Sequence, residues 1–180
     1  MDYGFTLEGA LGGASVRIDR PGSRFMASVS YPLMQPEVAR VFVARLIRAK
    51  SEGLRIPYPL LRLSQNGSGA PVVDGADQSG STINLRGFNP GFQFREGGWL
   101  SIEDASGQHY LHNVAALTTA ASDGRMALPI APMLRAPFAD GASVHVAKPM
   151  IEGVIEGESA DWTLRVDHLT QLSFTIKEAA

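Results

Sequence analysis

Short alternations of apolar and polar residues, separated by turn signals, dominate the chain. Two such runs flank the turn sequence Arg20-Pro21-Gly22-Ser23: residues 16–20 begin with Val16 and Ile18, and residues 25–31 place apolar side chains at every second position. A period of two is typical of strands, and a Pro-Gly pair between two such runs favours a tight turn. The pattern therefore predicts a β-hairpin over residues 16–31.

Residues 36–50 carry the one convincing helical pattern. Its apolar stripe consists of Val38, Phe42 and Leu46, flanked on the same side by Ala39, Val43 and Ile47. Such i, i+4, i+8 spacing places side chains on one face of a helix. A proline is well suited to the first turn, and a glycine to the stop after the last turn, so Pro36 and Gly53 bound the segment. We expect a helix over residues 36–50 with Phe42 buried in the middle of the stripe.

The rest of the chain predicts many short strands. Apolar runs lie at residues 54–63, 81–86, 99–103, 109–116, 125–130, 143–147, 154–156, 161–166 and 171–177. In the first of these runs, Pro57 and Pro59 confine the strand to an edge or an irregular course. Glycine-rich turn sequences separate most of these runs, a spacing typical of a small barrel or sandwich. The polar loop at residues 64–70 and Pro149 delimit a middle segment. We therefore expect a mainly β fold with one flanking helix and an inserted β-rich domain at residues 64–149, the other domain combining residues 1–63 and 150–180.

Composition excludes several classes of protein. Of the 180 residues, 44% are hydrophobic and 19% are charged, which is the balance of a folded chain and not of a disordered one. The net charge of −2 gives no overall basic field for nucleic-acid binding. With no cysteine, the chain has no disulfide, no thiolate metal site and no cysteine nucleophile. The first residues lack the basic start and apolar run of a signal peptide, so we expect assembly in the cytoplasm and no membrane insertion.

The polar residues do not assemble a recognisable active site. The histidines are His109, His112, His145 and His168. His109 and His112 are three residues apart in a predicted strand, so they point to opposite faces and do not converge on a metal. We expect these histidines at the surface or at an interface. Glu103, Asp104 and His109 flank the turn Ser106-Gly107, and the simpler interpretation is a polar hairpin tip.

Other motifs have equally plain interpretations. No Gly-x-Ser-x-Gly elbow or Walker loop occurs, and Asp74 and Asp77 around Gly75 supply too few oxygen ligands for calcium, so we interpret that segment as a turn. The sequence nominates no catalytic, cofactor-binding or metal-binding residue and no cofactor, and we do not expect an enzyme. The aromatic residues near a glycine-rich loop admit two interpretations, a base- or sugar-stacking platform or hydrophobic core; they are Phe88, Phe92, Phe94 and Trp99.

The order of elements resembles a known family. Three segments carry the resemblance: residues 16–50, with their strand, turn, strand and helix; residues 72–87; and residues 128–149. The chain is similar, from about residue 15 to residue 178, to the distal tail proteins of long-tailed, siphovirus-like bacteriophages, which are tail-tip or baseplate proteins with a tail-tube-like β fold.

The resemblance implies a structural virion protein. Its copies would form a ring, usually a hexamer, between the tail tube and the hub of the baseplate. Residues 1–63 and 150–180 would build the ring, and residues 64–149 would project as a peripheral domain. The implied partners are further copies of the chain, the tail tube protein and hub proteins, with DNA only as passing cargo. The alternative function is a carbohydrate-binding β-module for attachment to a host surface.

Overall fold

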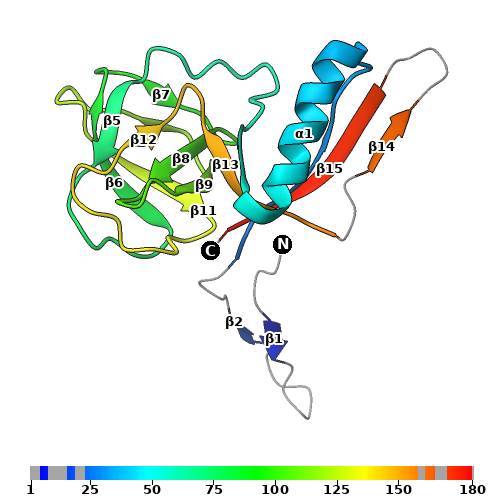
Figure 1. Cartoon of the computed structure of the whole chain (residues 1–180). Helices are drawn as coiled ribbons and strands as arrows, with labels where there is room; N and C mark the ends of the chain where they lie inside the picture. Colours follow the sequence, from blue (N-terminus) through cyan, green and yellow to red (C-terminus); the bar gives the residue numbers. More distant parts are fainter. Residues whose placement is uncertain (1–4, 8–15, 19–22, 158–160, 165–169, 180) are drawn as a thin grey trace. The chain divides into compact units, whose positions relative to one another are not determined.

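The structure is a computed structural model that describes residues 5–7, 16–18, 23–157, 161–164 and 170–179. It is mainly β with one helix, which confirms the predicted fold class. The chain divides into two compact units (Figure 1). Residues 57–151 belong to the first, here called the barrel unit, and residues 25–56 with 152–179 form the second, the helix unit. The segment predicted as an inserted domain, residues 64–149, lies within the barrel unit.

The barrel unit is built on a six-stranded antiparallel sheet in the order β12-β8-β9-β11-β6-β5. Its strands are β5 (Gly69–Val73), β6 (Thr82–Phe88), β8 (Trp99–Glu103), β9 (His109–Val114), β11 (Met126–Ala131) and β12 (Val144–His145). The short strands β7 (Gln93–Phe94) and β10 (Thr118–Thr119) pair with each other. The sequence runs predicted as strands at 81–86, 99–103, 109–116, 125–130 and 143–147 are confirmed by β6, β8, β9, β11 and β12.

The two end strands of this sheet approach each other and nearly close a barrel. Val72 forms an isolated bridge with Ser143, and the Val73 N–H donates to the Ala142 carbonyl at 3.0 Å. Alternating side chains fill the interior: in β6 the side chains of Ile83 and Leu85 are fully buried. Strands β8 and β9 depart from simple alternation, because each has a run of consecutive buried residues and is thus covered on both faces.

The helix unit consists of one helix and an antiparallel sheet. Its elements are β3 (Met26–Ser30), α1 (Pro36–Glu52), β4 (Leu54–Pro57), β13 (Met150–Ile155), β14 (Asp161–Leu164) and β15 (Thr170–Glu178), with β13 starting in the barrel unit. The long strand β15 pairs with β3, β13 and β14. Its residues Leu172, Phe174 and Ile176 are buried at every second position, as their alternation predicts. At Gly153 of β13 a side chain would collide with the Lys177 carbonyl, so glycine permits the close pairing with β15.

The helix forms where the sequence predicts it, but its inward face is narrower than predicted and includes Ala49. It starts at Pro36 and ends before Gly53, whose φ of 80° suits glycine. The buried helix residues are Ala39, Leu46 and Ala49, while Val38 and Ile47 are largely exposed. Phe42 is only half buried, with its ring 5.0 Å from that of Tyr31. The prediction of the inward stripe was therefore wrong at Val38 and Ile47, which lie at the two edges of the stripe and remain exposed to solvent.

One further prediction was wrong, and another is confirmed only in part. Strand β2 (Val16–Ile18) pairs with β1 (Phe5–Leu7), and β3 pairs with β15, so residues 16–31 do not form a hairpin. Period-two alternation identifies a strand but not its partner. The strand predicted over residues 54–63 begins at Leu54 but ends at Pro57. Pro57 and Pro59, which were expected to make its course irregular, have no N–H to continue a ladder. In the described part of the chain, no helix combines the length and apolar character needed to cross a membrane.

Candidate functional site

The barrel unit brings together four polar side chains that lie far apart in the sequence: Ser101, Glu103, His109 and His145. Strand β8 lies between β9 and β12 in the sheet. Glu103 is paired with His109 of β9, and Ser101 is paired with His145 of β12. Because residues i and i+2 of a strand share a face, all four side chains project to the same side of the sheet. We call this set the His–Glu cluster.

The contacts within the His–Glu cluster run diagonally across the strands. The Nε2 atom of His145 lies 2.9 Å from Glu103 Oε2, and the Nδ1 atom of His109 lies 3.3 Å from Ser101 Oγ. The two imidazole rings are 4.8 Å apart, centre to centre. Ser101 Oγ also accepts a hydrogen bond from the Met150 N–H at 2.9 Å. Ser101 is thereby anchored to backbone and in turn fixes the plane of the His109 ring.

Burial differs across the cluster. Ser101 and His109 are buried, with exposed fractions of 0% and 3%. The side chains of Glu103 and His145 keep 34% and 38% of their surface exposed. The cluster therefore has a rigid buried part and a part that solvent can reach. A small ion could enter from the side of Glu103 and His145.

His112 lies in a different environment from His109. It is fully buried, and the hydrogen bond between Nδ1 and the Pro132 carbonyl is 3.0 Å long. Its Nε2 has no hydrogen-bond partner in the described part of the chain. Burial, reinforced by the nearby charge of Arg135, lowers the pKa of His112 to about 3, so it is a neutral core residue near pH 7. The expectation of histidines at the surface or at an interface was thus wrong for His109 and His112, which are buried within the chain itself, while His168 lies outside the described residues.

Asp104 fits the interpretation of a hairpin tip. Its Oδ1 accepts hydrogen bonds from the N–H groups of Ser106 at 2.8 Å and Gln108 at 3.0 Å, and Oδ2 accepts one from the Tyr110 hydroxyl at 3.3 Å. Desolvation acts to raise the pKa of Asp104, but these hydrogen bonds outweigh it and hold the pKa below its usual value. Asp104 therefore closes the turn, while its neighbour Glu103 belongs to the His–Glu cluster.

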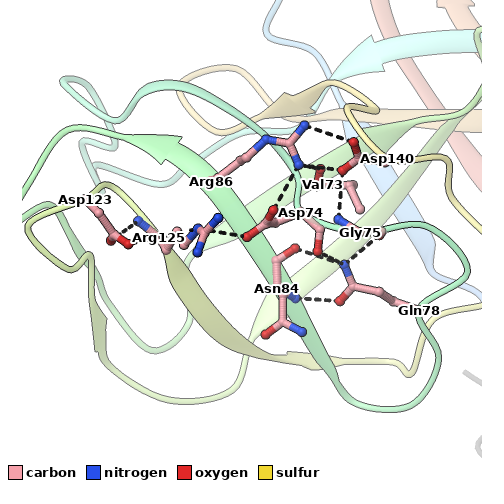
Figure 2. Close-up of polar contacts among 9 residues, drawn as sticks. All are labelled: Val73, Asp74, Gly75, Gln78, Asn84, Arg86, Asp123, Arg125 and Asp140. Carbon is pink, nitrogen blue, oxygen red and sulfur yellow. Dashed lines mark hydrogen bonds and ion pairs between the residues drawn. The ribbon is translucent and has the colours of Figure 1, made fainter.

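A second polar network surrounds Arg86 of β6 (Figure 2). The guanidinium of Arg86 donates to the carboxylates of Asp74, at 3.0 Å, and Asp140. Arg125 lies on the other oxygen of Asp74, at 3.2 Å. The hydrogen bond from Arg86, followed by one from the Gly75 N–H, lowers the pKa of Asp140 to about 2. The same two carboxylates raise the pKa of Arg86. Both oxygens of Asp74 are thus engaged by cations of the chain.

Gln78 completes the turn between β5 and β6. As Figure 2 shows, its amide nitrogen contacts the carbonyls of Asp74, Gly75 and Asn84, and its amide oxygen accepts the Asn84 N–H at 2.7 Å. Asp77, the second carboxylate considered for calcium, is exposed and takes a positive φ of 55°. The segment is therefore a braced turn, which agrees with its interpretation from the sequence.

The aromatic residues and the predicted boundary loop serve packing. Phe88 and Phe94 are buried, and Phe92 packs against both of them. Trp99 packs against Tyr58 with ring centres 4.3 Å apart. In the loop, buried Gln65 donates at 2.6 Å to the carbonyls of Trp99 and Val146 and accepts the Trp99 N–H at 2.9 Å. Sequence reasoning missed these hydrogen bonds of Gln65, because a glutamine in a polar loop gives no sign of burial.

Only part of the His–Glu cluster could have been predicted from the sequence. A hairpin centred near Ser106-Gly107 would place Glu103 opposite His109, so this pair could have been found from the turn. His145 could not, because its position depends on the pairing of β12 with β8. A comparison with protein-family models finds no match for this chain, and a comparison with curated proteins finds none either.

Proposed function

We propose that this protein is a structural subunit of a phage-like tail tip, in which copies of the chain form a ring that joins the tail tube to the hub of the baseplate. DNA would pass through the ring as cargo, and the chain would carry out no catalysis. Two things support the proposal: the resemblance of residues 16–50, 72–87 and 128–149 to distal tail proteins, and the surface of the helix unit. That surface carries the argument.

The helix unit exposes apolar side chains that a second chain could cover. Six of the eight large apolar side chains that are exposed in the described part of the chain belong to this unit: Met26, Leu33, Val38, Val41, Ile47 and Val154. On α1, helical geometry places Val38 and Val41 on one side of the buried stripe and Ile47 on the other. Apolar groups left exposed on one unit are groups that contact with another protein would remove from water.

The sheet of the helix unit also offers strand edges. Among the described strands, β3 pairs only with β15, so one edge of β3 has no strand beside it. Open edges of this kind favour pairing with another chain and are usually covered in a native assembly. A closed ring uses one heterologous interface repeatedly, which covers the edge of each subunit with its neighbour.

The glycan-binding alternative has less support. It depended on an aromatic platform made by Trp99 and the neighbouring phenylalanines. Phe88 and Phe94 lie in the core of the barrel unit, and Trp99 packs on Tyr58. Stacking on a sugar would need these ring faces to be open.

Electron microscopy of the particle that carries the protein tests the proposal. We expect a ring at the tail end, coaxial with the tube. The variant Val41→Glu should reduce incorporation into the ring, because it puts a charge on an exposed apolar position of α1. Leu117→Glu, at an exposed apolar position of the barrel unit, is the matched control. A free monomer that turns over a small substrate and is absent from particles would overturn the assignment.

A further inference from the structure

We propose that Glu103, His109 and His145 form a binding site for a divalent transition-metal ion of the zinc class. One ligand atom from each of the three side chains lies within 4.8 Å of the other two. All three belong to the barrel unit, so the site is complete within one compact part of the chain. The proposal is independent of ring assembly and would hold if the proposed function failed.

The sheet holds the three ligands in place. They come from three adjacent strands, β9, β8 and β12, and the pairing of Glu103 with His109 and of Ser101 with His145 fixes their relative positions. An ion bound here would clip these strands together. Of the three strands, β12 is the shortest, with two residues, and would gain most from such a clip.

The donor set selects the class of metal. Two imidazoles and one carboxylate are ligands that zinc accepts readily. Calcium and magnesium prefer sites made of oxygen atoms, so they are poor candidates. Three protein ligands also leave one position of a tetrahedral ion for water or for a donor from another molecule.

The cluster needs only a small adjustment to bind an ion. Ligand atoms lie about 2.0–2.2 Å from zinc, so two ligands of one ion are separated by no more than about 4 Å. The ligand atoms of the three side chains, now within 4.8 Å of one another, therefore have to move slightly closer together. Glu103 and His145 can supply this movement because both are half exposed, and their contact at 2.9 Å would be replaced by two bonds to the ion. His109 stays fixed by Ser101, as an outer-shell hydrogen bond typically fixes a metal-binding histidine.

Titration of the full chain with zinc tests the site. The protein, without an affinity tag and after removal of metal by a chelator, is titrated with ZnCl₂ by isothermal titration calorimetry. We expect saturable binding of one ion per chain and a higher Tm in the presence of zinc. Cobalt(II) should give the intense visible absorption of a tetrahedral site in place of the weak bands of the hydrated ion.

Two single variants decide whether these residues are the ligands. His145→Ala and Glu103→Gln change half-exposed side chains, so they should keep the fold, and each should weaken zinc binding by at least about tenfold. The exposed Glu96 supplies the control Glu96→Gln, which should bind zinc like the unchanged protein. The proposal would be overturned if the unchanged protein showed no saturable zinc binding. It would also be overturned if His145→Ala and Glu103→Gln bound zinc as tightly as the unchanged protein. Circular dichroism verifies that each variant is folded.

Discussion

The two units of the chain handle their apolar surface differently. The barrel unit wraps a six-stranded sheet almost into a closed barrel and fills it with side chains such as Ile83, Leu100 and Leu128, all fully buried. The helix unit has a sheet with open edges, and its helix leaves about half of the Val41 and Ile47 side chains exposed. The barrel unit thus buries its apolar side chains within its own sheet, while the helix unit leaves apolar side chains exposed to water.

The hydrogen bonds of polar side chains also differ between the two units. In the barrel unit, buried Gln65 and the Arg86 network tie loops to strands, so polar groups reinforce closure. Polar side chains on β3 and β15 of the helix unit, such as Ser28 and Thr175, contact each other in an exposed position at 3.1 Å. If the ring proposal holds, the barrel unit folds as a single copy, and the exposed apolar side chains of the helix unit are covered by a neighbouring chain. Four variants test this difference.

The largest effect is expected in the core of the barrel unit. Phe138 is 1% exposed, and its ring lies edge-on to Tyr110 at 5.3 Å. Phe138→Ala should lower the free energy of unfolding by about 3–5 kcal/mol, because it removes a large buried ring and leaves a cavity. Urea denaturation measures the change, with exposed Leu117→Ala as control. A loss below about 1 kcal/mol would contradict the tightly packed core inferred here.

The second effect is a dependence of stability on pH. The pKa of His112 is about 3 in the folded protein, because the side chain is buried, against an ordinary histidine value of about 6.5. Between these values the unfolded chain binds a proton and the folded chain does not, so stability is complete above pH 6.5 and falls as the pH decreases. At pH 5 this amounts to a loss of about 2 kcal/mol.

Urea denaturation at pH 7 and at pH 5 measures this loss, and His112→Leu removes the titrating group. The variant lacks the hydrogen bond to Pro132, so its stability at pH 7 is not the readout. Its stability should change less between the two pH values than that of the unchanged protein. Equal changes in the two proteins would show that His112 does not control the acid sensitivity of the barrel unit.

Sequence patterns predicted the elements of both units better than their partners. Alternation and glycine turns located β6, β8, β11 and β15, and Pro36 and Gly53 bounded the helix. The pairing of β3 with β15 joins residues about 147 positions apart, such as Ser28 and Thr175, and no local pattern encodes it. Likewise, no local pattern shows that Val38 and Ile47, at the edges of the apolar stripe, stay exposed while Ala49 is buried.

The candidate site follows the same rule. Glu103 and His109 are brought together by a local hairpin, whose turn is visible in the sequence. His145 and Ser101 meet through the long-range pairing of β12 with β8, which is visible only in the fold. A site on three strands is thus predictable from sequence only as far as its local turns extend.

A smaller effect is expected at Phe42 of the helix unit. Its ring contacts Tyr31 but is only half buried. Phe42→Ala should therefore cost about 1–2 kcal/mol, less than the 3–5 kcal/mol of a fully buried phenylalanine, because part of its apolar surface already lies in water. Thermal or urea unfolding beside Phe138→Ala measures the difference. Equal losses at the two positions would mean that the helix unit is as tightly packed as the barrel unit.

The smallest effect on stability is expected for the double substitution Val41→Ser and Ile47→Ser. These side chains are 49% and 57% exposed, so the isolated chain should change by no more than about 0.5 kcal/mol per site. Because serine keeps the positions uncharged, any loss of ring incorporation would report the lost apolar contact and not charge repulsion. A monomer that loses several kcal/mol would show that Val41 and Ile47 are packed within their own chain. Unchanged stability of the isolated chain together with reduced ring incorporation would support the inferred difference between the units. The barrel unit would then fold as a single copy, while the exposed apolar side chains of the helix unit would contact a neighbouring chain.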